Sequence, residues 1–148
     1  MAMHIAKQIS VFLANKPGTL AAICDVLAEA QINIYAISTS DTIDHSVVRL
    51  VVDHPQRALQ IFERHGSLVV VTDVLLIDGS NQPGSLLLIA KALAEADINI
   101  EYCYCATSPL AKKGLMIMRT SNVEKSLRVL NGPTSRKPTA TARKKNGR

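Results

Sequence analysis

The chain has 148 residues, 47% of them hydrophobic and 20% charged, which excludes a disordered chain and suffices for one ordinary domain or two small ones. No apolar run approaches the roughly 20 residues of a membrane-spanning helix, and residues 1–8 show no signal-peptide core, so we expect a cytoplasmic protein with no membrane partner. The net charge of +5 comes from residues 132–148, which hold six of the seventeen basic residues and no acidic one. We expect this tail to be disordered, and its charge does not by itself indicate nucleic-acid binding.

The first half of the chain alternates between the patterns of short strands and helices. β-branched and alternating apolar residues indicate the strands, and apolar residues at helical spacing indicate the helices. Thr19 follows the Pro17-Gly18 turn, where its hydroxyl is expected to cap the first helix, and Pro55 suits the first position of the second. The predicted order is βαββαβ, with strands at residues 7–14, 32–40, 47–52 and 68–71 and helices starting at Thr19 and Pro55.

The second half repeats this order through its second helix. Strands are predicted at residues 74–78, 98–106 and 115–119, with helices starting at Ser85 and covering 123–130. The position of the fourth strand falls on residues 134–137, a Thr-Ser-Arg-Lys segment that is too polar for a buried strand. The second half is therefore predicted to lack a regular fourth strand: either a partner supplies that strand, or the encoded C-terminus is displaced from the ancestral one.

The two halves are copies of one unit at a constant offset of 66 residues. The sequence NKPGTL, from Asn15 to Leu20, returns as NQPGSL from Asn81 to Leu86, and the register holds without a gap to the end of the second helix. We expect two units, at residues 5–72 and 73–131, followed by the tail at 132–148. A unit of this size buries little core of its own, so the two are expected to pack side by side.

The first helix of the second unit carries extra apolar residues. Leu87 and Leu88 stand where the first unit has Ala21 and Ala22. An apolar surface beyond one helical stripe needs cover. We therefore expect contact with another copy of the chain and a homo-oligomer, most simply a dimer.

The repeated turn has the chemistry of a site for a zwitterion. Asparagine precedes a Pro-Gly turn, and a hydroxyl residue then begins a helix whose first N–H groups suit a carboxylate. The asparagine offers an amide donor and a carbonyl acceptor, and a second asparagine follows 18 residues later in each unit, at Asn33 and Asn99. A purely structural interpretation stays open, because Pro-Gly before Thr or Ser also makes ordinary turns and caps.

This constellation resembles the ACT domain, a small βαββαβ regulatory module, over residues 7–130. The resemblance implies an α+β fold of two ferredoxin-like units and a small amino acid held between units by the turn of one and the second strand of its neighbour. A family member that binds serine has a histidine where this chain has Leu13 and Gly79, which leaves room here for an apolar ligand side chain. The residues that the resemblance assigns to the ligand are Asn15, Pro17, Gly18, Thr19, Leu20, Asn33, Ile34, Asn81, Pro83, Gly84, Ser85, Leu86, Asn99 and Ile100.

Other chemistry finds little support in the sequence. Cys103 and Cys105 share one strand face without further ligands, so no metal site or cofactor is expected, and no nucleophile with its base can be assembled into a catalytic site. The prediction is a non-enzymatic regulatory protein that passes amino-acid occupancy to a partner enzyme or regulator. The alternatives are a structural module for oligomerisation without ligand, or a nucleic-acid accessory protein that acts through its basic tail.

Overall fold

The computed structural model describes residues 1–42 and 45–132, so most of the predicted tail and the polar segment at 134–137 lie outside the described residues. Within the described part, no helix is long and apolar enough to cross a membrane. The elements follow the predicted order in both halves. They are β1 (Ala2–Ala14), α1 (Thr19–Glu29), β2 (Ile34–Asp41), β3 (His45–Val52), α2 (Pro55–Arg64), β4 (Leu68–Ser80), α3 (Ser85–Glu95), β5 (Ile100–Ala106), β6 (Lys113–Thr120) and α4 (Val123–Asn131).

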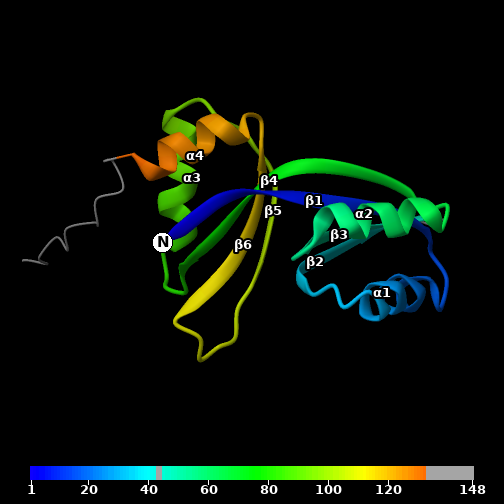
Figure 1. Ribbon diagram of the computed structural model, residues 1–148. Helices are drawn as coiled ribbons and strands as arrows, with labels where there is room; N and C mark the ends of the chain where they lie inside the picture. The colour runs from blue at the N-terminus through cyan, green and yellow to red at the C-terminus, as the bar shows by residue number, and fades with distance from the viewer. Residues whose placement is uncertain (43–44, 133–148) are drawn as a thin grey trace, which may run out of the picture.

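The described strands form one antiparallel sheet in the order β2-β3-β1-β4-β6-β5. The first unit uses β2-β3-β1-β4 with α1 and α2, and the second uses β1-β4-β6-β5 with α3 and α4 (Figure 1). Each unit therefore has the strand order of a ferredoxin-like fold. This confirms the predicted α+β class with two such units side by side.

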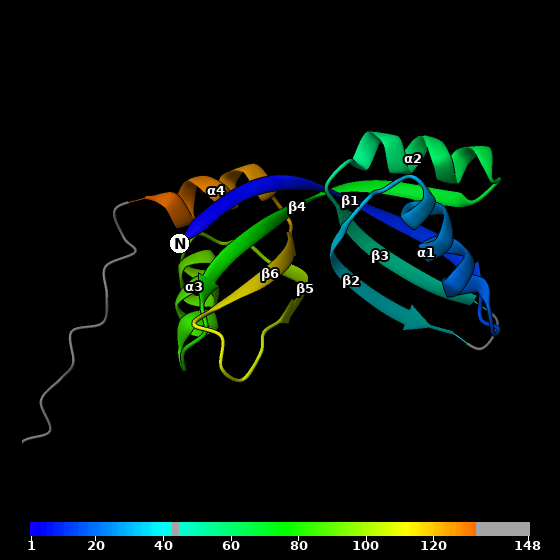
Figure 2. The same cartoon turned by 60° about the horizontal axis from the view of Figure 1, so that its bottom comes forward.

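The two central strands are longer than predicted and belong to both units. β4 is one strand of 13 residues where the sequence suggested two short ones, and Figure 2 shows β1 and β4 running together from one unit into the other. The first five residues of β1, Ala2–Ala6, pair with the Val74–Asp78 part of β4. They fill the place of the fourth strand that the second repeat was predicted to lack, so the chain's own beginning completes the second sheet.

A pseudo-twofold axis passes through the centre of this strand pair. Lys7 lies opposite Asp73 in the register, and these two residues are also equivalents under the offset of 66. Their side chains form an ion pair with Lys7 Nζ 2.6 Å from Asp73 Oδ1. A rotation about this point therefore relates the two units of the repeat.

The predicted offset of 66 without a gap is wrong beyond the second strands: Leu50 pairs with Ile9, and its equivalent Met118 pairs with Leu75. The loop between β5 and β6 therefore holds two inserted residues relative to the first unit.

Each unit has its own hydrophobic core on the helix-covered face of the sheet. Ile9 and Val11 of β1 are buried in the first core, with Phe62 of α2, whereas Met3 and Ile5 of the same strand pack against the second. Successive side chains of a strand point to opposite faces, so these four odd-numbered residues share one face of β1. Both helix pairs therefore cover the same side of the continuous sheet.

The opposite face holds a buried polar cluster near the centre. Gln8 is fully buried; its Nε2 donates to the Tyr102 hydroxyl at 2.7 Å, and its Oε1 accepts from the Tyr104 hydroxyl at 2.9 Å. The guanidinium of Arg49 lies 4.6 Å from the centre of the Tyr102 ring. Burial raises the pKa of the Tyr104 hydroxyl above its usual range, with Tyr102 adding to the shift and Arg49 opposing it. This cluster links β5 to β1 across the sheet.

Candidate functional site

The turn before α1 shapes the end of the first unit. Gly18 occupies the position that caps the helix, with φ 91° and no side-chain hydrogen bond to the helix, a conformation that glycine adopts without steric cost. The predicted cap, Thr19, is instead the first helical residue, and its hydroxyl donates to the backbone oxygens of Ala14 and Lys16. The first N–H groups of α1 receive no side-chain cap, because the capping residue Gly18 has no side chain and the Thr19 hydroxyl bonds to the turn.

A hollow of about 270 Å³ opens beside this turn. It lies between the turn, the start of α1 and the adjacent ends of β2 and β3, and it contains three of the predicted ligand residues, Asn15, Thr19 and Leu20. The Asn15 amide donates to the Thr42 backbone oxygen at 3.2 Å. The full lining is Leu13, Asn15, Lys16, Thr19, Leu20, Thr39, Asp41, Ser46 and Val48.

The hollow combines opposite charges with an apolar floor. Lys16 supplies a cation and Asp41 an anion, while Thr39 and Ser46 add hydroxyl groups. Val48 is 1% exposed and belongs to the first core, so this floor is fixed by the packing of the unit. Pockets for drug-sized ligands span roughly 300–1,000 Å³, so a hollow of this size suits a smaller molecule such as one amino acid.

The equivalent turn of the second unit is bonded to its neighbouring loop. Gly84 has φ 89° and again caps its helix without a side chain. The Asn81 amide donates to the backbone oxygens of Ser108 at 3.4 Å and Ala111 at 2.8 Å, and these bonds tie the loop between β5 and β6 to the turn. The Thr107 hydroxyl donates to the Lys113 backbone oxygen at 3.2 Å, which joins the two ends of that loop.

The second pair of asparagines lies at the other end of each unit. Asn33 directly precedes the eight-residue strand β2, and at about 3.3 Å per residue the strand separates it from the Asn15 turn. The Asn33 backbone N–H donates to Asp53 Oδ1, and that of Asn99 donates to the Ser121 hydroxyl, both at 3.1 Å. The next residues, Ile34 and Ile100, pack against the two cores.

Within one chain the structure thus groups Asn15, Thr19 and Leu20 but not Asn33. Both Asn33 and Asn99 are exposed, and their backbones join the start of the second strand to the start of the second helix. A site that combines a turn with a second-strand asparagine would need a neighbouring copy of the chain.

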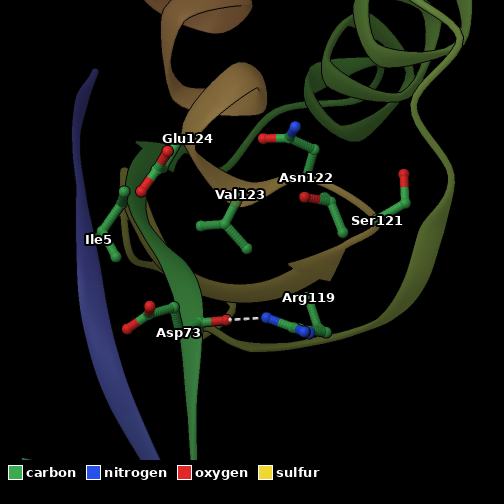
Figure 3. Close-up of a pocket in the computed structure, with 8 residues that line it drawn as sticks. Ile5, Asp73, Arg119, Ser121, Asn122, Val123 and Glu124 are labelled. Atoms are coloured by element: carbon green, nitrogen blue, oxygen red, sulfur yellow. Dashed lines mark hydrogen bonds between the residues drawn. The ribbon is translucent and has the colours of Figure 1, made fainter.

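A second hollow, of about 170 Å³, lies beside the start of α4 (Figure 3). Two of its three charged side chains already have partners: Arg119 donates to the Asp73 backbone oxygen at 2.8 Å and to Glu101 at 3.2 Å, and Asp73 pairs with Lys7. The third, Glu124, lies in the first turn of α4, and Asn122 caps that helix by accepting from the Lys125 backbone N–H. Because the hollow beside Asn15 is larger and contains predicted ligand residues, we regard it as the better candidate.

Several lining residues had no signal in the sequence. Thr39, Asp41 and Ser46 lie on strand ends that follow the turn by about twenty residues or more. Only the pairing of β3 with both β1 and β2 brings them beside the turn and α1. Lys16 was visible inside the repeated turn, but its counterpart Gln82 is neutral. The repeat therefore did not single out Lys16, which is recognised only as a difference between the two copies.

The described part of the chain contains no cluster of possible metal ligands. Over residues 1–42 and 45–132, no three His, Cys, Asp or Glu side chains gather in a group that could hold a metal ion. The cysteines Cys24, Cys103 and Cys105 are free thiols.

A family model described as an ACT domain pair matches residues 3–132. Protein BT0572 from Bacteroides thetaiotaomicron is 32% identical to this chain and its crystal structure gives a TM-score of 0.80, with 86% of this chain and 88% of that chain covered. The ligand-free regulatory subunit of aspartate kinase from Thermus thermophilus is 22% identical with a TM-score of 0.65, and covers 88% of this chain and 95% of that one.

The regulatory subunit of aspartate kinase from Thermus flavus is also 22% identical, with a TM-score of 0.60 and coverage of 87% and 93%. The two kinase subunits share the fold with this chain. No curated protein matches the chain.

Proposed function

The chain belongs to the family of ACT domain pairs, and we propose on that basis that it is a non-enzymatic regulatory protein that binds a small free amino acid. The observation that carries the proposal is the hollow beside Asn15, where Lys16 and Asp41 face an apolar floor in a space of about 270 Å³. A free amino acid presents the matching groups: a carboxylate, an ammonium and one side chain. The fold shared with regulatory subunits of aspartate kinase supports a regulatory role.

Occupancy of the hollow would reach the rest of the molecule through shared strands. Leu13 in the lining belongs to β1, and the same strand continues into the sheet of the second unit. A ligand that favours one arrangement of the turn therefore biases both units, and a partner enzyme or regulator that binds the second unit would sense it.

The proposal includes a second copy of the chain. Leu86, Leu87 and Leu88 at the start of α3 are 44%, 55% and 50% exposed, as expected of a surface that another chain covers. The exposed asparagines, Asn33 and Asn99, are then available to a turn of the neighbouring copy. In this arrangement the predicted ligand residues, separated within one chain, meet between two chains.

A thermal-shift screen of the twenty free amino acids tests the proposed function. A ligand that binds only the folded protein raises the free energy of unfolding, by about 2.7 kcal/mol at one hundred times its dissociation constant, so the melting temperature increases with ligand concentration. The control is Asn15→Ala, which removes one group at the rim and should reduce the shift. A melting temperature that stays constant with every amino acid would refute the proposal.

The exposed leucines of α3 also favour a second candidate, an oligomerisation module that binds no ligand. Under this alternative the repeated turns only hold the backbone in shape. Sedimentation should then show a dimer that no amino acid alters and that Leu87→Glu dissociates, whereas a monomer at micromolar concentration would exclude it. The nucleic-acid alternative depends on residues 133–148, which lie outside the described residues, and we do not propose it.

A further inference from the structure

Building on the proposed function, we infer that only the first unit of each chain binds the amino acid, and that Lys16 and Asp41 select an α-amino acid with both charged groups free and an uncharged side chain. This inference concerns the number of sites and the class of ligand. It follows from the residues that line the hollow and from those that replace them in the second unit.

The two charges of the hollow are available to a ligand. Among the described residues, neither the Lys16 nor the Asp41 side chain forms an ion pair or a hydrogen bond. Both line the same small space, so one molecule can contact both. The carboxylate of an amino acid pairs with the lysine and its ammonium with the aspartate, and charged hydrogen bonds of this kind are stronger than neutral ones.

The rest of the lining determines the side chain of the ligand. Leu13, Leu20 and Val48 are apolar, and Lys16 and Asp41 are its only charged residues. A third charge on the ligand would lose water without gaining a partner, which is costly. The hollow therefore favours an amino acid whose side chain is aliphatic or carries a hydroxyl group for Thr39 or Ser46.

The second unit lacks both charges at the equivalent positions. Gln82 replaces the lysine and Thr107 the aspartate, and Gly79 replaces Leu13. The strand register makes Gly114 the equivalent of Ser46 and Met116 the equivalent of Val48, so an apolar residue remains at that position. A Cβ atom on Gly114 would lie 3.3 Å from the Thr107 side chain, so the glycine lets the loop approach. The two charges are therefore absent together, whereas the apolar floor has lost Leu13.

The hydrogen bonds of the two turns differ in the same direction. Asn81 binds two backbone oxygens of its loop, and its own N–H donates to the Lys112 backbone oxygen at 3.0 Å. Over residues 1–42 and 45–132, the Asn15 side chain makes one such bond, to the Thr42 backbone oxygen. The second turn is therefore bonded more extensively to the loop between β5 and β6 than the first turn is to the described part of its own loop.

Isothermal titration of the full chain tests this inference. The probes are free L-valine, L-leucine and L-threonine, with N-acetyl-L-valine and L-valinamide as forms that each lack one charge. At least one free probe should bind with one molecule per chain, and the blocked forms should bind at least tenfold more weakly. L-Valine and L-threonine have nearly the same shape, so their ratio separates an apolar from a hydroxyl preference.

Matched variants locate the site. Lys16→Gln and Asp41→Thr give the first turn the residues of the second and should each weaken binding about tenfold or more, since a charged hydrogen bond contributes about 1.5–3 kcal/mol. Gln82→Ala and Thr107→Ala should leave the affinity within twofold. All four positions are exposed, and an unchanged melting temperature without ligand shows that each variant folds.

The outcomes separate this inference from the proposed function. Two molecules per chain, equal binding of the blocked forms, or equal losses in the two sets of variants would overturn the inference and leave amino-acid binding intact. If all three probes fail and an amino acid whose side chain is neither aliphatic nor hydroxylated binds, the ligand class is overturned. If none of the twenty amino acids binds, the proposed function is wrong and the inference falls with it.

Discussion

The two units share a backbone but differ in the side chains that surround their hollows. The shared glycines lie where the chain needs a special conformation: Gly18 and Gly84 have φ 91° and 89°. The equivalent positions Gln31 and Asp97 differ in residue type, yet both have φ 55°. These repeated positions build turns and helix ends. The positions whose backbone conformation is repeated therefore indicate a structural role.

Two of the places where the units differ are the first turn and the centre of the sheet. Lys16 and Asp41 have neutral counterparts, and the buried Gln8 has Val74 as its equivalent. In a duplicated chain, one unit keeps its chemistry while the other is free to take a structural role. The differences between copies are therefore a better guide to function than the likenesses.

The largest expected effect tests whether the two units are independent. Leu27 and Leu93 are equivalent residues, 1% and 0% exposed, and each substitution to alanine should lower the free energy of unfolding by about 2–5 kcal/mol. Because β1 and β4 belong to both sheets, either variant should unfold in one transition, as measured by urea denaturation. Leu110→Ala, at a residue that is 93% exposed, is the control with an effect within about 0.5 kcal/mol. Two separate transitions would show that the units fold alone.

A smaller effect is expected at the centre, where one residue can be replaced by its own counterpart. Gln8→Val leaves the hydroxyls of Tyr102 and Tyr104 without the partner that they have now, which should reduce stability by about 1–3 kcal/mol. In a double-mutant cycle, Tyr104→Phe should cost less in the Gln8→Val background than in the natural chain. Strictly additive losses would contradict a coupled cluster.

The smallest effect concerns pH and is confined to the first unit. The hydrogen bond from His54 lowers the pKa of Asp53 below its ordinary value of 3.8; burial opposes this shift, and the backbone N–H of Asn33 adds to it. A lowered pKa in the folded state means that the contribution to stability is present above 3.8 and is lost as the pH falls through the folded pKa.

Melting temperatures measured across this acidic range check the expectation. Asp53→Asn should flatten the fall in stability, because its side chain does not titrate. In the second unit the hydroxyl of Ser121 plays the equivalent part toward Asn99, so Ser121→Ala should leave the shape of the pH profile unchanged. An unaltered profile in Asp53→Asn would show that other carboxyl groups account for the acid sensitivity.

The sequence predicted the element order well because its signals were local. The Pro-Gly turns, the apolar spacing of the helices and Pro55 at the start of α2 each act within a few residues. Three local predictions failed: Thr19 is not the cap of α1, since Gly18 takes that place; β1 begins at Ala2 and not at residue 7; and β4 continues through residues 72 and 73, where no glycine or proline interrupts it. All three errors concern the ends of elements, where several residue types compete for one role.

The candidate site was predictable only in part. Asn15, Thr19 and Leu20 were found because they repeat, but Thr39, Asp41 and Ser46 come from strand ends distant in the sequence. Asn33 was assigned to the same site from a resemblance, but within one chain the length of β2 separates Asn33 from the Asn15 turn.

The order of residues alone determined that this is a duplicated α+β chain with a special turn in each copy, because periodic apolar residues and turn residues act over short distances. Only the tertiary structure decided that Ala2–Ala6 complete the second sheet and that the ends of β2 and β3 meet the first turn in one hollow. The reason is that every residue except proline has the same backbone hydrogen-bonding groups. The strand that pairs with an open sheet edge is therefore set by which segment the folded chain places beside that edge.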